Sequence, residues 1–214
     1  MSDQRGPLDV RRAGVLLHVT SLPSGDLGDD AHDFVDFLAA AGCSVWEVLP
    51  LVAADEESRS PYQALSAMAG HPGLIHRDPD TERLLADPSA LDARQRADLA
   101  SWCAEHGDWL EPYVEFTALR ELHGQAPWTS WPPALRDRDA RAVREALAPL
   151  ADRVQRLRLE QWVFAVQWAR LRGHVASRGV LLFGDLPIFV SFDSADVWAS
   201  RELFELDVDG RPTT

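Results

Sequence analysis

Gly179-Val-Leu-Leu-Phe-Gly-Asp-Leu-Pro-Ile-Phe-Val190 is the stretch with the clearest structural signal in the chain. Its residues 180–183 form an apolar run without a polar face, which is typical of a parallel strand buried on both faces. A Gly-Asp pair ends the run, and Pro187 prevents a central strand from continuing. The stretch therefore predicts a carboxylate, that of Asp185, at the carboxyl end of a buried strand. In α/β barrels this end of the sheet carries the chemistry.

Two further strands are predicted near the amino terminus. Residues 14–17 and 45–49 are short apolar runs, and Pro50 closes the second of them. Between them, apolar residues at 30–41 recur at helical spacing, and Gly42 is suited to end that helix. A strand, a helix and a strand in this order predict a right-handed crossover between two parallel strands.

The long interval before the third strand is predicted to be mainly helical. Helix-forming residues prevail at 91–105 and 112–123, and residues 139–172 are expected to form one or two long helices. Scattered prolines mark loops between these segments. We interpret residues 75–150 as a helical insertion between the second and third strands.

Together these elements predict an α/β fold, an incomplete (β/α)8 TIM barrel that contains the first three strands and a helical insertion subdomain. The predicted divisions are 1–74 for the first strands and a loop, 75–150 for the helical subdomain, and 151–214 for a return helix, the third strand and its loop. Such a barrel needs roughly 250 residues even without insertions. Because the chain has 214, we expect an amino-terminal fragment of a larger protein. A compact three-layer domain is the alternative.

Composition narrows the class of function. The net charge of −13 argues against nucleic acid or an anionic membrane as partner and is compatible with a neutral substrate. The two cysteines form neither a disulfide framework nor a zinc pattern, and no phosphate-binding loop or complete dinucleotide fingerprint occurs. The first residues lack the apolar core of a signal peptide, and no run reaches transmembrane length. We therefore predict a soluble cytoplasmic protein.

The motif Ser60-Pro-Tyr-Gln63 follows the second strand and admits two interpretations. In a barrel it would lie on the same rim as Asp185. There Tyr62 would offer a flat ring with a hydroxyl, which suits stacking on a sugar and hydrogen bonding to it. Alternatively the motif begins a helix, with Ser60 as N-cap and Pro61 at the first helical position. The two interpretations are compatible.

The polar residues after the third strand are also open to two readings. Asp185 either binds hydroxyl groups or forms a turn, and its position at the end of a strand favours binding. We expect Asp193 and Asp196 to cap the turn that leads to Trp198. Most of the tryptophans are expected to pack in the core, and Trp198 is the best candidate among them for contact with a ligand.

Six blocks of sequence, taken in order, form a recognisable set. They are Gly14-Val-Leu-Leu-His18 with Thr20-Ser-Leu-Pro23, Trp46-Glu-Val-Leu-Pro-Leu51, Ser60-Pro-Tyr-Gln-Ala-Leu-Ser-Ala-Met-Ala-Gly70, Trp128-Thr-Ser-Trp-Pro132, Gln161-Trp-Val-Phe164, and 184–212. This set resembles the 4-α-glucanotransferases (amylomaltase, or disproportionating enzyme) of glycoside hydrolase family 77, and the resemblance spans nearly the whole chain.

The resemblance implies a barrel of the α-amylase clan and a cytoplasmic enzyme that acts on maltooligosaccharides and other α-1,4-glucans. The reaction would be a retaining transfer, in which an aspartate attacks the anomeric carbon and a glutamic acid protonates the leaving oxygen. No metal or organic cofactor is implied. By resemblance, Tyr62 and Ser60 belong to the donor-site loop, and Asp185 belongs to the active-site cleft.

The resemblance assigns no catalytic residue to this chain, because the family's catalytic carboxylates belong to segments that would follow Thr214. We therefore expect the isolated chain to be inactive. Two other functions stay open. One is a different hydrolase of the α-amylase clan, and the other is a non-catalytic glucan-binding protein built around Tyr62 and Asp185.

Overall fold

A computed structural model describes residues 6, 9–54, 60–186 and 188–213, and the chain divides into two compact units. The first unit comprises Met1–Pro50, Gly73–His76 and Val166–Leu186, and the second comprises Leu51–Pro72, Arg77–Ala165 and Pro187–Thr214. The first unit holds the sheet, and the second holds most of the helices.

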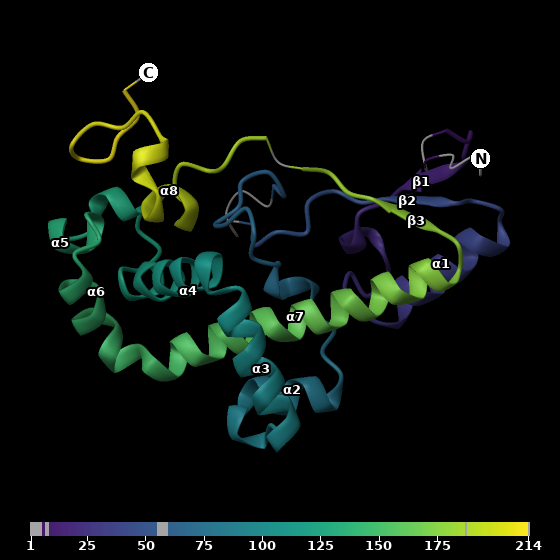
Figure 1. The fold of residues 1–214 in the computed structure, drawn as a ribbon, viewed down its shortest axis with the longest axis horizontal. Coiled ribbons are helices and arrows are strands. Elements are labelled where there is room, and N and C mark those ends of the chain that lie inside the picture. Colours follow the sequence, from purple (N-terminus) through teal and green to yellow (C-terminus); the bar gives the residue numbers. More distant parts are fainter. Residues whose placement is uncertain (1–5, 7–8, 55–59, 187, 214) are drawn as a thin grey trace, which may run out of the picture. The chain divides into compact units, whose positions relative to one another are not determined.

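The sheet of the first unit has three parallel strands in the order β1-β2-β3, which run side by side in Figure 1. They are β1 (Gly14–Leu16), β2 (Val45–Glu47) and β3 (Leu181–Phe183). Helix α1 (Asp29–Ala40) connects β1 to β2, which confirms the predicted strand-helix-strand start. Gly42 follows α1 with a φ of +75°, the left-handed conformation expected of a glycine that ends a helix.

The two faces of this sheet differ in burial. Trp46 on β2 is fully buried, with its ring 5.2 Å from that of Phe34 and its indole N–H donating to the carbonyl of Leu17 at 2.8 Å. On the opposite face, Leu16 is 57% exposed and Phe183 is 52% exposed. The prediction that the third strand is buried on both faces is therefore wrong, because the second face of the described sheet remains open to solvent.

The second unit is built from helices. They are α2 (Pro79–Ala86), α3 (Ala93–Glu105), α4 (Gly107–Leu122), α5 (Pro133–Arg136), α6 (Ala140–Leu147), α8 (Ala195–Ala199) and the first part of α7 (Ala151–Ser177). Short 3-10 turns occur along the chain at Val19–Ser21, Pro72–Leu74, Pro88–Ala90, Trp128–Ser130, Ala148–Leu150 and Arg201–Leu203. The helix predicted from residue 112 begins earlier, so that Pro112 lies inside α4.

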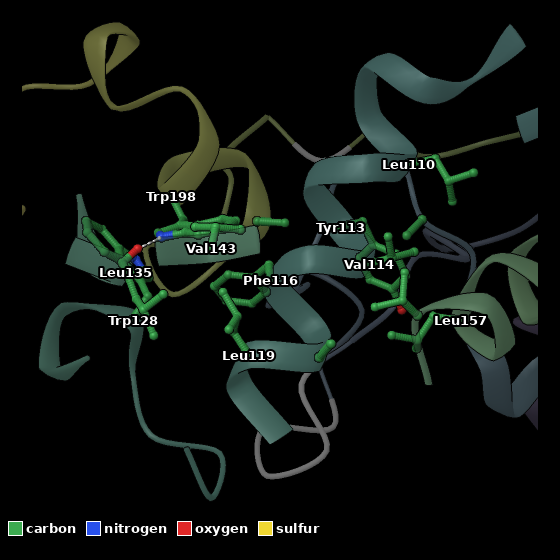
Figure 2. Close-up of a cluster of buried hydrophobic side chains, with 14 of the residues drawn as sticks. Leu110, Tyr113, Val114, Phe116, Leu119, Trp128, Leu135, Val143, Leu157 and Trp198 are labelled. Carbon is green, nitrogen blue, oxygen red and sulfur yellow. Dashed lines mark hydrogen bonds between the residues drawn. The ribbon is translucent and has the colours of Figure 1, made fainter. Parts of the chain in front are cut away.

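Helix α4 supplies the centre of the core of the second unit, and Figure 2 shows its buried side chains facing those of neighbouring segments. Among these neighbours is Trp198 on α8, which is 1% exposed. Its indole N–H donates to the carbonyl of Leu135 at 3.0 Å, the dashed line in Figure 2. Trp198 thus packs in the core of the second unit, and its contact with a ligand stays a prediction.

Candidate functional site

Tyr62 lies in a turn of the second unit, residues 60–63, which we call the Tyr62 turn. The hydroxyl of Ser60 accepts a hydrogen bond from the N–H of Tyr62 at 3.3 Å, and the N–H of Gln63 donates to the carbonyl of Ser60 at 3.0 Å. The described residues that follow Ser60 form a turn, so the alternative prediction that Ser60 caps a helix is wrong. The side chain of Tyr62 is 48% exposed, which leaves part of its ring accessible to a ligand.

The chain on either side of the Tyr62 turn doubles back on itself. Antiparallel bridges join Val52 to Gly70 and Ala54 to Ala64. Backbone hydrogen bonds of 2.8 and 2.7 Å also join Ala53 to the returning chain. The segments 52–54 and 64–70 are therefore paired along their backbones.

The return arm, residues 64–70, is held by α8. The N–H of Ala195 donates to the carbonyl of Leu65 at 2.8 Å, and the carboxylate of Asp196 accepts a hydrogen bond from the N–H of Ala67 at 2.9 Å. Burial raises the pKa of the Asp196 carboxyl above its usual value, and the hydrogen bond from Ala67 opposes that rise. A partly buried carboxylate thus holds the arm that follows the Tyr62 turn.

The far end of the return arm is held by α7. The buried side-chain amide of Gln161 accepts a hydrogen bond from the N–H of Gly70 at 2.8 Å and donates one to its carbonyl at 2.9 Å. One glutamine therefore satisfies both polar groups of a backbone position, as a neighbouring strand would. A Cβ atom at Gly70 would run into the ring of Phe164, so only glycine fits this approach.

The turn before α8 is capped by a hydroxyl. Ser194 is the N-cap of α8, and its hydroxyl accepts a backbone hydrogen bond at 3.3 Å. The carboxylate of Asp193 instead accepts the N–H of Trp128 at 3.0 Å and pairs with Arg120 at 3.4 Å. The prediction that Asp193 and Asp196 cap this turn is therefore wrong, because both carboxylates reach backbone groups far away in the sequence.

Asp185 lies in the first unit, two residues after β3, and is exposed. The N–H of Val48 donates to the carbonyl of Phe183 at 2.9 Å, so the chains after β2 and β3 stay paired close to this carboxylate. The structure brings Ser60 and Tyr62 together in one turn, whereas Asp185 belongs to the other unit.

The second unit also contains a cavity of about 760 Å³ among α4, α6, α7 and α8, which none of the three predicted site residues lines. Its charged walls are largely paired, with Arg158 2.5 Å from Glu111 and Arg138 3.1 Å from Glu115. Within the described part of the chain, no three acidic, histidine or cysteine side chains are grouped so as to hold a metal ion. None of the described helices has the length and apolar character needed to cross a membrane.

These features define an α/β protein whose candidate ligand groups lie on loops that follow parallel strands. A family model described as 4-alpha-glucanotransferase matches residues 17–91 and 81–212. The chain therefore belongs to the 4-α-glucanotransferase family.

Individual relatives agree with this assignment. The chain is 40% identical to a 4-alpha-glucanotransferase of Thermus thermophilus, covering 95% of this chain and 47% of the relative. It is 36% identical to one of Aquifex aeolicus, covering 95% and 48%. Its fold is similar to that of an amylomaltase from Streptococcus agalactiae solved in complex with acarbose, with a TM-score of 0.85, 29% identity, and coverage of 94% of this chain and 48% of the other. The chain spans about half the length of the curated relatives it matches.

Proposed function

We propose that this chain forms part of a 4-α-glucanotransferase, which moves α-1,4-glucan segments between maltooligosaccharides with retention of anomeric configuration. The observation that carries the proposal is the Tyr62 turn, in which a half-exposed aromatic ring is mounted on an arm fastened at several points. An aromatic face with a hydroxyl is suited to bind a sugar ring. The similarity to an amylomaltase solved with acarbose supports a saccharide as the ligand.

In a retaining transfer, one carboxylate attacks the anomeric carbon while a carboxylic acid gives its proton to the leaving oxygen. The hydroxyl of an acceptor sugar then attacks the covalent intermediate and returns a proton to that acid/base residue. In our proposal Tyr62 stacks on the donor sugar, Ser60 shapes the turn beneath it, and Asp185 accepts hydrogen bonds from sugar hydroxyls. None of the three supplies the nucleophile or the proton.

Because the family resemblance assigns neither the nucleophile nor the acid/base group to this chain, we expect these 214 residues to bind glucans without transferring them. The test is to incubate the purified chain with maltotriose and to resolve the products by length. We expect unchanged maltotriose. A ladder of longer and shorter maltooligosaccharides would contradict the absence of essential carboxylates, and glucose as the dominant product would indicate a hydrolase of the same clan.

The binding role of Tyr62 is tested by titrating acarbose and maltotetraose into the chain in a calorimeter. We expect Tyr62→Ala to weaken binding about tenfold, which corresponds to about 1.4 kcal/mol, and Tyr62→Phe to retain most of the affinity because the stacking face remains. Tyr113→Phe, in the core, is the matched control and leaves binding unchanged. Equal affinity of Tyr62→Ala and the wild type would exclude Tyr62 from the site.

A further inference from the structure

We infer that Asp196 and Gln161 are positioning residues for the Tyr62 turn: they fix the return arm so that the Tyr62 ring is presented to a saccharide in one orientation. The inference rests on the proposed function for its ligand. The positioning of the Tyr62 turn is independent of the proposed function, because it is a property of the chain without ligand.

The return arm has fixed points near its start, middle and end, at the carbonyl of Leu65, the N–H of Ala67 and both backbone polar groups of Gly70. Their partners lie on α8 and α7. The bridge between Ala54 and Ala64 joins the start of this arm to the arm that precedes the turn. The orientation of Tyr62, two residues before this bridge, is thus set by contacts made up to eight residues further along.

Residues other than Asp196 provide the N-cap of α8 and its main contact with the core. Its N-cap hydrogen bond comes from Ser194, and its place in the core is secured by Trp198, with a hydrogen bond to Leu135. Asp196 is partly buried, and the backbone N–H that it accepts outside its own helix belongs to Ala67. The carboxylate of Asp196 therefore links α8 to the return arm by a hydrogen bond that α8 does not require for its N-cap.

Gln161 is 2% exposed and lies within the apolar stretch of α7. Any aliphatic side chain would fill this position at lower cost in desolvation, but it would leave the N–H and the carbonyl of Gly70 without these partners. The absence of a side chain at Gly70 lets the arm approach Phe164 closely. Helix α7 therefore holds the end of the arm by shape and by hydrogen bonds together.

The experiment uses the two tyrosines of the chain as built-in reporters. With 3-fluorotyrosine at both positions, the fluorine spectrum contains one resonance from the exposed Tyr62 and one from Tyr113, which is 2% exposed in the core of the second unit. The variants are Asp196→Ala, which removes the acceptor, and Asp196→Asn, which keeps an acceptor oxygen of the same shape. Asp193→Ala is the matched control, because it removes a carboxylate from the same turn that contacts Trp128 and not the return arm.

We expect Asp196→Ala to shift or broaden the Tyr62 resonance while the Tyr113 resonance stays in place, and Asp196→Asn to restore the wild-type spectrum. Asp193→Ala should leave the Tyr62 resonance unchanged. In the same samples, the affinity for acarbose should fall about tenfold in Asp196→Ala, the scale expected when one partner of a partly buried hydrogen bond is removed. Gln161→Leu should alter the Tyr62 resonance in the same way.

Two results would overturn the inference. The first is a Tyr62 resonance that stays unchanged in Asp196→Ala, and the second is a change of both resonances together, which would make Asp196 a residue needed for the whole unit. If the wild-type chain does not bind acarbose, the proposed function fails. The ligand-free spectra would still decide whether Asp196 positions Tyr62.

Discussion

The carboxylate of Asp26 gathers three hydrogen bonds just before α1. It accepts from the ring of His76 at 3.0 Å, from the N–H of Gly28 at 2.9 Å and from the hydroxyl of Ser24 at 3.0 Å. Burial alone would raise the pKa of Asp26, but these hydrogen bonds outweigh it and hold the pKa below its ordinary value. The single side chain therefore ties the segment at residue 76 to the start of α1.

This arrangement predicts a stability effect that depends on pH. Because the pKa of Asp26 is lowered in the folded state, its contribution is present above the unfolded pKa of about 3.9 and is lost as the pH falls towards the folded value. Asp26→Asn should cost about 1–2 kcal/mol at pH 6, and its difference from the wild type should shrink near pH 3. Urea melts at the two pH values measure this, with the exposed Asp33→Asn as control. If Asp26→Asn lowered the free energy of unfolding by the same amount at pH 6 and at pH 3, the lowered pKa of Asp26 would be contradicted.

At the scale of elements, the contact between α7 and the return arm depends on Gly70. We expect Gly70→Ala to lower the free energy of unfolding by about 1–3 kcal/mol, because the new Cβ meets the ring of Phe164 in a packed core. Gly173→Ala, within α7 and with open space around the added Cβ, should instead stabilise the chain by about 0.5–1 kcal/mol. Urea melts of the two variants, measured side by side, test the contact. A Gly70→Ala variant as stable as the wild type would show that Phe164 can move aside.

Local patterns predict the elements of this chain better than they predict its tertiary contacts. The helix expected at 30–41 is observed as α1, Asp29–Ala40, because apolar spacing and a terminal glycine are local signals. The long segment 139–172 is observed as α6 and α7, separated by a turn that contains Pro149. In contrast, Asp196 finds its partner 129 residues away, and spacing cannot show such a pairing. Gln161 is a polar residue inside an apolar stretch of helix, and this is a local sign in the sequence of its contact with Gly70.

The candidate site was only partly accessible to sequence reasoning for the same reason. The Tyr62 motif and the carboxylate after β3 are both visible as short runs of residues. The roles of Asp193 and Ser194 depend on which group reaches the first N–H groups of α8, and the shorter serine side chain takes that place. The exposure of Phe183 depends on what covers the sheet, which an apolar run does not reveal.

At the scale of the whole molecule, the open face of the sheet is the dominant feature of the first unit. In the described sheet β1 and β3 each pair with a neighbour on one side, and Leu16, Leu181 and Phe183 remain more than a third exposed on the same face. Parallel strands are normally covered on both faces, and exposed strand edges are templates for pairing with other chains. An uncovered apolar face next to such edges therefore favours association between copies of the chain.

We expect the 214-residue chain to self-associate reversibly, with a sedimentation coefficient that rises with concentration. The double variant Leu181→Lys and Phe183→Lys places two charges on the open face, beside Glu47, and should keep the chain monomeric, because a second copy could then cover that face only by removing charged groups from water. Phe37→Lys is the control: Phe37 is 62% exposed on α1 rather than on the sheet, and its replacement should leave association unchanged. Equal suppression by Phe37→Lys would assign the effect to net charge, and a wild-type chain that stays monomeric at every concentration would refute the role of the sheet. The charged variant would also provide a monomeric background for the fluorine experiment, since its substitutions lie in the first unit and the reporters Tyr62 and Tyr113 lie in the second.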